Sequence, residues 1–330
     1  MHESPFISVV IPTYNRQSRV VQAIESVLAQ TYRHLEIIVI DDGSTDATEE
    51  LVRALISKHP AEPRIRYLQQ ENSGASAARN TGIREAAGTW IGFLDSDDIW
   101  MPDKLQCQVH AIERFGDHCG ACFTDARLTD SRGLDTTAFR KMGLRYAEAT
   151  GIVEDSVRPL ARAFGSIWVQ TVIARRELIE MIGGFDSNVK FGEDHDFLFR
   201  LALLTPYCYA NAPLVEIDRS TAAINPAVPA RQWDHVEFRL EAYQYMHEKW
   251  LRLKDEYPED VIRIITQNLR GVHSGWANWY LENARFEDAR RAAARGLHYE
   301  VTPQLILKWV LTRIVPHIAR RIVPRTAGML

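Results

Sequence analysis

The sequence predicts an α/β sandwich, in which helices cover both faces of a central, mostly parallel β-sheet. Short apolar runs alternate with helical stretches four times in the first 110 residues or so, which is the pattern of this fold class. The run at 90–94 is almost wholly apolar, as strands buried on both faces are. Beyond about residue 233 helical spacing continues without strands, which predicts a helical C-terminal extension.

The expected strands end at proline, acidic residues or other turn formers. They cover residues 6–11, 35–40, 64–68 and 90–94, and later 120–124 and 167–174. Helical spacing places helices between them, including 75–87, closed by Gly88, and 104–115, preceded by Pro102. The stretch 125–165 lacks clear periodicity, so we expect an insertion or lid that faces the substrate rather than core.

Length and composition set broad limits on the chain. At 330 residues it exceeds the usual size of a single core, so we expect the sandwich at 1–225 and the helical region at 226–330. The formal net charge of −4 does not indicate a nucleic-acid partner. No segment is long and uncharged enough to span a bilayer, and the N-terminus lacks signal-peptide features. The expected location is therefore the cytoplasm.

Carboxylates gather where two expected strands end. Asp95, Asp97 and Asp98 follow the run at 90–94, and Asp41 and Asp42 follow the run at 35–40. The carboxyl ends of such strands share one edge of the sheet, where open α/β sheets bind ligands. Two such charges about 4 Å apart repel by about 4 kcal/mol at an effective dielectric near 20, which favours a cation between them. Mg²⁺ or Mn²⁺ shared with a diphosphate fits; the alternative is a solvated turn and helix cap.

A third acidic pair begins a later helix. Glu193 and Asp194 precede apolar residues at helical spacing, where the helix dipole favours anions. They could simply cap this helix, or one of them could serve as a general base at the mouth of a cleft. A glycine-rich phosphate-binding loop does not follow the first strand, so any nucleotide would be held through carboxylates and a metal.

Five motifs together resemble the family 2 glycosyltransferases, over roughly residues 5–220. They occur in the family's order and at its spacing. The motifs are VVIPTYNR at 9–16, DDGSTD at 41–46, NSGA at 72–75 with ARNTG at 78–82, FLDSDD at 93–98, and GGFD at 183–186 with ED at 193–194. The resemblance implies a GT-A fold and an inverting, non-processive transferase that moves one sugar from a nucleotide-sugar donor, with UDP as the expected nucleotide. The acceptor would be a saccharide or lipid-linked saccharide, as in bacterial surface-polysaccharide assembly.

The resemblance also assigns site residues. Those implied for the nucleotide-sugar are Pro12, Thr13, Tyr14, Asn15, Asp42, Gly74, Arg79, Asp95 and Ser96. Asp42 would accept a hydrogen bond from a uracil-type imide, and Arg79 would help to fix the nucleoside. Asp97 would be the direct ligand of Mn²⁺ or Mg²⁺, and Asp95 would lie near the ribose or the water shell of the metal. Asp194 would be the catalytic base, with Glu193 orienting the acceptor or its loop.

The sequence departs from the family at two points. Ser220 and Thr221 follow Arg219 where many members have a histidine two positions after the arginine, so this position offers no third metal ligand. His195 could replace it, although a position on the helix surface is favoured. The Q-x-x-R-W signature is also absent, since glycine stands at Gly271 where tryptophan is expected. A processive polysaccharide synthase is therefore not expected.

The C-terminal stretch has two interpretations. Apolar residues at 307, 311, 314, 318 and 322 line one helical face, and the residues after Glu300 include basic but no acidic side chains. This helix could lie on an anionic membrane surface, which would make the protein peripheral on the inner face of the membrane. It could equally pack on neighbouring helices or on a second subunit in a homo-oligomer.

Two other functions are compatible with the same sheet and carboxylates. A nucleotidyltransferase would release inorganic pyrophosphate, but it would normally carry a basic glycine-rich loop after the first strand, where this chain has Pro-Thr-Tyr-Asn. A non-catalytic scaffold that binds sugar nucleotides would have no chemical need for both Asp97 and Asp194.

Overall fold

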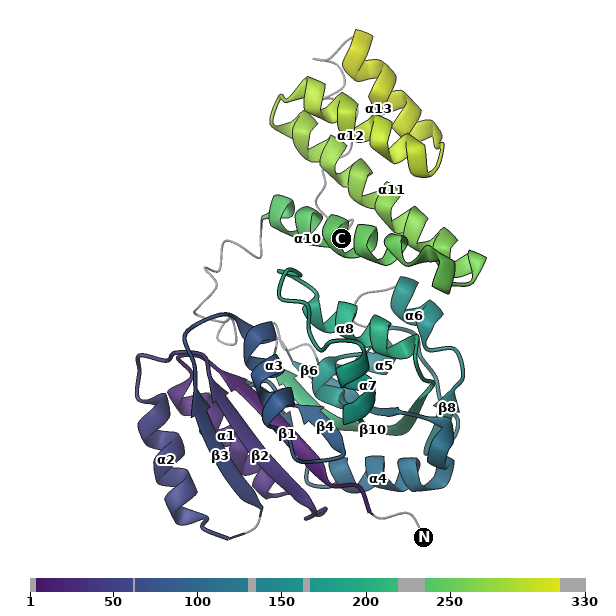
Figure 1. The fold of residues 1–330 in the computed structure, drawn as a ribbon. Helices are drawn as coiled ribbons and strands as arrows, with labels where there is room; N and C mark the ends of the chain where they lie inside the picture. The colour runs from purple at the N-terminus through teal and green to yellow at the C-terminus, as the bar shows by residue number, and fades with distance from the viewer. Residues whose placement is uncertain (1–3, 62, 130–134, 163–166, 219–234, 315–330) are drawn as a thin grey trace. The chain divides into compact units, whose positions relative to one another are not determined.

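A computed structural model describes residues 4–61, 63–129, 135–162, 167–218 and 235–314 of the chain (Figure 1). The chain divides into two compact units. The first, an α/β unit, comprises residues 1–188 and 193–228, and the second, a helical unit, comprises 189–192 and 229–330. The boundary expected at 225/226 lies outside the described residues, as does the expectation for Arg219 to Thr221.

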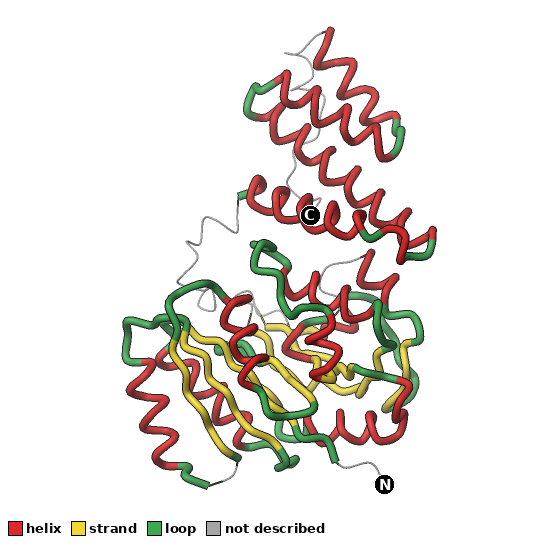
Figure 2. The backbone as a smooth tube through the Cα atoms, in the orientation of Figure 1, coloured by secondary structure: helices red, strands yellow, loops and turns green. Residues whose placement is uncertain are grey.

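The α/β unit is built on one ten-stranded sheet, drawn in yellow in Figure 2. Its order is β3-β2-β1-β4-β9-β6-β10-β5, while β7 pairs with β6 and β8 pairs with β10. The strands are β1 (Ile7–Thr13), β2 (Leu35–Asp41), β3 (Arg64–Gln69), β4 (Trp90–Phe93), β5 (Ile99–Trp100), β6 (Ala121–Thr129), β7 (Asp135–Thr137), β8 (Thr150–Val153), β9 (Val172–Arg175) and β10 (Tyr207–Asp218).

The predicted mostly parallel sheet is confirmed. Strands β1, β2, β3 and β4 pair in parallel, and β6 pairs in parallel with β10. Because β9 is antiparallel to both β4 and β6, those two strands run in the same direction. Every residue of β1 and β2 is buried, which explains why these strands are continuously apolar rather than alternating.

Helices cover both faces of this sheet (Figure 1). They are α1 (Gln17–Leu28), α2 (Thr48–Lys58), α3 (Ala75–Glu85), α4 (Lys104–Phe115), α5 (Ala138–Lys141), α6 (Val157–Arg162), α7 (Arg176–Met181) and α8 (Glu193–Ala202). Apolar residues of α1, α2 and α4 share one core with Ile7, Val9 and Ile11 of β1. Since successive strand residues point to opposite faces, Val10 faces α3, where the helix approaches so closely that only Gly82 fits.

The expectation of an irregular insertion at 125–165 is wrong for the described part of that stretch. Strand β6 continues to Thr129, and the chain then forms β7, α5, β8 and α6. Strands β7 and β8 add antiparallel to β6 and β10. These elements contain only 3–6 residues each, too few to show a hydrophobic period in the sequence.

The helical unit contains α10 (Val236–Arg252), α11 (Glu259–Glu282), α12 (Phe286–Tyr299) and α13 (Pro303–Ile314), and each of these helices packs on the next. Leu281 and Ala289 form a small core at one end, with Phe286 and Leu311 packed against it. Among the described helices, none is long and apolar enough to cross a membrane. The basic stretch after Ile314 lies outside the described residues.

Candidate active site

The loops after β1 and β2 lie side by side because the two strands pair in parallel, with Thr13 opposite Asp41. The backbone N–H of Asp42 donates to the carbonyl of Thr13 at 2.9 Å. The loops then interlock through Asn15, whose N–H donates to Ser44 Oγ and whose Oδ1 accepts from the N–H of Thr45. Asn15 has a φ of 49°, a conformation that asparagine tolerates better than most residues.

Asp42 binds the loop between β3 and α3, at the same edge of the sheet. Its Oδ1 accepts from Gln70 Nε2 at 2.7 Å and from the N–H of Ser73 at 2.9 Å, while its Oδ2 accepts from the N–H of Gly74 at 2.7 Å. A carboxylate offers about four lone-pair sites, so one remains for a ligand donor such as an imide N–H. Gly74 has a φ of 89°, which requires glycine at this turn.

Arg79 forms the centre of the carboxylate cluster. This α3 side chain is buried, and its guanidinium donates to Asp95 Oδ1 at 2.6 Å and to Glu193 Oε1 at 3.1 Å. It also lies over the ring of Phe185, 5.2 Å from the centroid. Burial alone would lower the pKa of Arg79, but the charges of Asp95 and Glu193 outweigh it and raise this pKa above its ordinary value. One cation thus joins Asp95, after β4, to the start of α8.

The two aspartates of the D-x-D sequence differ in their surroundings. Both oxygens of Asp95 accept hydrogen bonds, from Arg79 on one side and from Gln170 Nε2 at 2.5 Å on the other. Asp97 forms an ion pair with Arg16, at 3.4 Å. Burial and the negative charge of Asp95 raise the pKa of Asp97 to about 6, although Arg16 opposes the shift.

Asp194 begins α8 beside Glu193. Its Oδ1 accepts from the N–H of His195 at 2.8 Å. Burial and the charge of Glu193 raise the pKa of Asp194 to about 6, with Arg79 acting against them. A carboxyl group that gains a proton near pH 6 is ionised at neutral pH yet basic enough to accept a proton from an alcohol.

The structure therefore brings four of the predicted residues into one electrostatic cluster, namely Arg79, Asp95, Glu193 and Asp194. It places Asp97 two positions along the same loop and Ser96, which is buried, between the aspartates. The expectation that His195 lies on the helix surface is wrong, because only 3% of it is exposed. Pro12 and Thr13 are buried and Tyr14 is half-buried at the end of β1.

Sequence reasoning missed Gln170, Phe185 as a contact of Arg79, and the pairing of Arg16 with Asp97. Gln170 lies in a 3-10 turn, Val169–Thr171, directly before β9. Because β9 runs antiparallel to β4, its first residues lie at the edge where β4 ends. Only the strand direction could have revealed this, and a four-residue strand gives no such signal in a sequence.

The predicted metal ligands fit a divalent ion that a diphosphate helps to bind. The Asp97 side chain is 21% exposed, and the Asp95 carboxylate has lone pairs beyond the two that accept from Arg79 and Gln170. Among the described residues no group of three histidine, cysteine or acidic side chains gathers as a closed metal site. Mg²⁺ commonly binds through one or two carboxylates and takes its other ligands from substrate phosphates and water.

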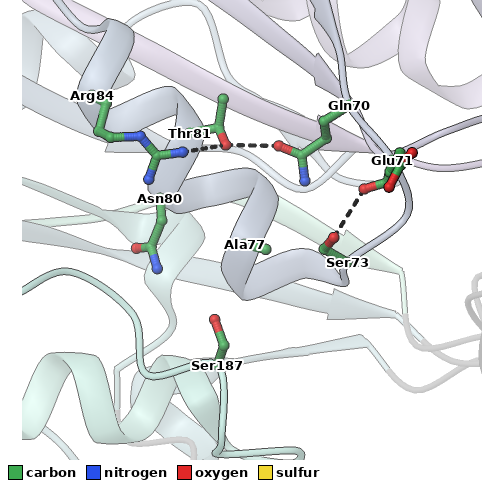
Figure 3. A pocket seen from close by; sticks show the side chains of 8 residues that line it. All are labelled: Gln70, Glu71, Ser73, Ala77, Asn80, Thr81, Arg84 and Ser187. Atoms are coloured by element: carbon green, nitrogen blue, oxygen red, sulfur yellow. Dashed lines mark hydrogen bonds between the residues drawn. The ribbon is translucent and has the colours of Figure 1, made fainter.

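A groove of about 470 Å³ lies along α3 (Figure 3). Its lining residues are Gln70, Glu71, Ser73, Ala77, Asn80, Thr81, Arg84 and Ser187. A hydrogen-bonded chain runs from Arg84 through Thr81 to Gln70, and Gln70 donates in turn to Asp42. None of Arg79, Asp95, Glu193 and Asp194 lines the groove, but Gln70 links it to Asp42.

Comparison with known families matches residues 8–151 to "Glycosyl transferase family 2", a range that includes the β1 loop, Asp42, Arg79 and the D-x-D sequence. The α/β unit belongs to this family. The chain is 30% identical over 213 residues to an uncharacterized glycosyltransferase of Rickettsia typhi, a match that covers 64% of either chain.

Two further relatives of the chain carry descriptive names. The putative teichuronic acid biosynthesis glycosyltransferase TuaG of Bacillus subtilis is 37% identical over 148 residues, which are 44% of this chain and 57% of TuaG. The succinoglycan biosynthesis protein ExoO of Rhizobium meliloti is 33% identical over 199 residues, which are 59% of this chain and 55% of ExoO. The matches therefore span less than two thirds of the length of these relatives.

Solved structures show the same fold. TarS of S. aureus, residues 1–349 in complex with UDP, superposes with a TM-score of 0.65 at 18% identity, covering 96% of this chain and 91% of that one. The mannosyltransferase PcManGT of Pyrobaculum calidifontis, in complex with GDP-Man and Mn²⁺, gives a TM-score of 0.54 at 22% identity, covering 97% and 83%. The fold is therefore of the GT-A type expected from the motifs.

Proposed function

We propose that this protein transfers a single sugar from a nucleoside-diphosphate sugar to a hydroxyl group of a saccharide or lipid-linked saccharide, with inversion at the anomeric carbon. The observation that carries the proposal is the cluster around Arg79. It holds Asp95, which follows β4, beside Glu193 and Asp194, which begin α8. A donor-binding carboxylate and a candidate base thus lie at one edge of the sheet, as a transfer between two bound substrates requires.

The nucleoside would be held by the loops after β1 and β2. Asp42 has one free acceptor site, and Tyr14 is half-buried beside it at the end of β1. An acceptor at this point matches a base that presents an N–H, as uracil does. The complex of TarS with UDP supports a UDP-linked donor, because TarS shares this fold.

Asp97 and Asp95 would hold the divalent ion at the donor diphosphate. Bound there, Mn²⁺ or Mg²⁺ would neutralise charge on the leaving diphosphate without a proton transfer. The complex of PcManGT with Mn²⁺ supports this part of the proposal. Asp97 would be the direct ligand, because its partner in the structure is Arg16 at 3.4 Å. Asp95 would act through the water shell, because both of its oxygens already accept from Arg79 and Gln170.

Asp194 would remove the proton from the acceptor hydroxyl as that oxygen attacks the anomeric carbon. Such general-base help contributes typically about 10²–10⁴-fold to a rate. Glu193 is tied to Arg79, so it would fix the start of α8 and orient the acceptor rather than take the proton. One base opposite the leaving group gives a single displacement, and hence inversion.

The names of TuaG and ExoO support an acceptor in bacterial surface-polysaccharide assembly. The proposal makes the α/β unit the catalytic part, in the cytoplasm, and the helical unit a site for oligomerisation, acceptor contact or membrane-surface contact. Sedimentation with anionic vesicles, comparing the full chain with a chain ending at Glu300, tests the last of these. Equal pelleting of the two chains would remove membrane contact through the C-terminal helix from the proposal.

A screen of nucleotide sugars, with and without Mn²⁺, tests the function itself. The expected product is the nucleoside diphosphate, released faster when a saccharide acceptor is added. Inorganic pyrophosphate as the product would instead establish a nucleotidyltransferase. Donor binding without any turnover across acceptors would favour a non-catalytic scaffold.

A further inference from the structure

Gln170 reaches the carboxylate cluster from a part of the chain that no motif covers. The antiparallel strand β9 lies between β4 and β6, and Gln170 precedes its first residue by two positions. Its Nε2 donates to Asp95 Oδ2 at 2.5 Å, opposite the bond from Arg79 to Oδ1. The two oxygens of Asp95 are therefore fixed by two different elements of the fold.

The backbone of Gln170 is itself held firmly. Its carbonyl accepts from the indole N–H of the buried Trp100 at 3.0 Å. The carbonyl of the next residue, Thr171, accepts from Gln108 Nε2 at 3.0 Å. Lys104 completes this layer, because its ammonium lies 3.7 Å from the Trp100 ring centroid and donates to Gln108 at 2.8 Å. A firmly held backbone fixes the direction from which the amide meets Asp95.

The two ends of the Gln170 amide differ, because the nitrogen donates to Asp95 and the oxygen bonds to none of the described residues. Only 7% of Gln170 is exposed, yet its Oε1 has no hydrogen-bond partner among the residues that the structure describes. The amide cannot turn over, since its oxygen would then face the acceptor Asp95. A buried, unpaired amide oxygen destabilises a protein, and an apolar side chain of this size would avoid that cost. Retention of the amide therefore points to its other contact, the bond to Asp95.

We propose that Gln170 is a positioning residue of the donor site, which holds the Asp95 carboxylate in the orientation that the nucleoside diphosphate and its metal ion require. The proposal rests on the function proposed above and assigns one more residue to the same site. With Arg79 and Gln170 on its two oxygens, Asp95 cannot rotate toward Asp97. Asp97 is thereby left as the open carboxylate of the pair.

The test uses the full chain with Gln170→Leu, which removes the N–H donor and the unpaired oxygen together. Its matched control is Thr171→Val, which removes a buried bond from Thr171 Oγ1 to the Trp168 carbonyl in the same turn without touching Asp95. Isothermal titration measures UDP affinity at saturating Mn²⁺ and Mn²⁺ affinity at saturating UDP, and thermal denaturation gives Tm.

We expect Gln170→Leu to weaken UDP and Mn²⁺ binding about 10–100-fold, as loss of an outer partner of a metal site does. Its Tm should stay within about 3 °C of the wild type. Thr171→Val should lower Tm but leave both affinities unchanged. Equal affinities for Gln170→Leu and the wild type would overturn the proposal, and so would a loss of affinity in Thr171→Val as large as in Gln170→Leu.

Gln170→Glu separates the two ends of the amide. It keeps an oxygen in place of Oε1 but puts a second carboxylate against Asp95, so binding should fall at least as far as in Gln170→Leu. Wild-type binding by Gln170→Glu would overturn the proposal, because the unpaired oxygen would then be the functional end. Failure of the wild-type chain to bind UDP or any other nucleoside diphosphate would instead count against the proposed function.

Discussion

At the scale of single residues, Arg79 determines how the carboxylates of the site can coexist. Three acidic groups lie close to its guanidinium, and it forms ion pairs with two of them, Asp95 and Glu193. Without it their mutual repulsion would act inside a largely buried site, where charges are poorly screened. The residue that the resemblance links to the nucleoside thus also joins Asp95 to Glu193, the proposed donor and acceptor sides.

Replacement of Arg79 by lysine should damage both stability and activity. A lysine has one ammonium group in place of the planar guanidinium, so it cannot donate in the same two directions to Asp95 and Glu193. Breaking a buried ion pair costs about 3–5 kcal/mol, so we expect a loss of this order in Arg79→Met and a smaller loss in Arg79→Lys. Urea denaturation measures it. Wild-type stability in Arg79→Met would show that the cluster needs no internal cation.

Asp97→Asn should abolish donor turnover, because the amide removes the charge expected to bind the metal ion. Donor turnover is measured as release of the nucleoside diphosphate in the presence of Mn²⁺. The matched control is Asp103→Asn, an exposed aspartate six positions further along whose side chain accepts a hydrogen bond from the Thr31 hydroxyl. The control should keep wild-type turnover. Full turnover in Asp97→Asn would remove this residue from the site.

Activity should fall on the acid side with a midpoint near pH 6. The pKa of Asp194 is raised to about 6, and a general base works only when deprotonated, so kcat/KM is full above that pH and lost below it. The pKa of Asp97 is also raised to about 6, so the activity is measured at saturating Mn²⁺, which keeps Asp97 bound to metal. The fall in activity on the acid side can then be assigned to Asp194. A profile that stays flat down to pH 4.5 would exclude Asp194 as the base.

At the scale of elements, the distance between α3 and β1 sets where Arg79 lies. A Cβ on Gly82 would come within 2.2 Å of Val10 Cγ1, so the helix can approach the strand only at a glycine. This close packing places the first turns of α3 against the ends of β1 and β2. The helix therefore carries the site residue Arg79 on one face and the groove residues on the other.

Gly82→Ala should destabilise the α/β unit by about 1–3 kcal/mol, the usual cost of overpacking a core. Gly271 of α11 provides the matched control, since a Cβ there would meet nothing within 4 Å. Gly271→Ala should be neutral or stabilise by up to about 1 kcal/mol, because alanine favours helix. Urea denaturation followed by circular dichroism compares the two. Equal effects of both variants would show that the α3–β1 distance is not fixed by this contact.

At the scale of the whole molecule, the two units accommodate buried ionisable side chains in different ways. In the α/β unit the buried Arg79 is paired with Asp95 and Glu193, whereas in the helical unit burial lowers the pKa of two histidines. His247 Nδ1 donates to the carbonyl of Tyr243 at 2.7 Å, which leaves Nε2 to accept from Asn268 Nδ2 at 3.1 Å. This arrangement requires the neutral ring. Burial lowers the pKa of His247, and likewise that of His273, to about 4.

The helical unit should therefore lose stability as the pH falls. Both histidines have a pKa near 6.5 when unfolded and about 4 when folded, so the unfolded chain binds more protons between these values. The stability is full above pH 6.5, and about 2 kcal/mol per histidine should be lost by pH 5. Urea denaturation of the full chain at pH 7 and pH 5 checks this. Unchanged unfolding of the helical unit at pH 5 would contradict it.

The sequence alone determined the fold class, the main strands and helices of the α/β unit, and the motifs at the edge of its sheet. It could do so because buried parallel strands and their helices leave long, regular hydrophobic patterns, and because strand ends in such a sheet must meet. The tertiary structure alone decided that 135–162 adds strands and short helices, that His195 is buried, and that Arg79 and Gln170 hold Asp95 from two sides. Those features depend on contacts between segments 16 and 75 residues apart or on strands of three or four residues, and neither leaves a local pattern in the chain.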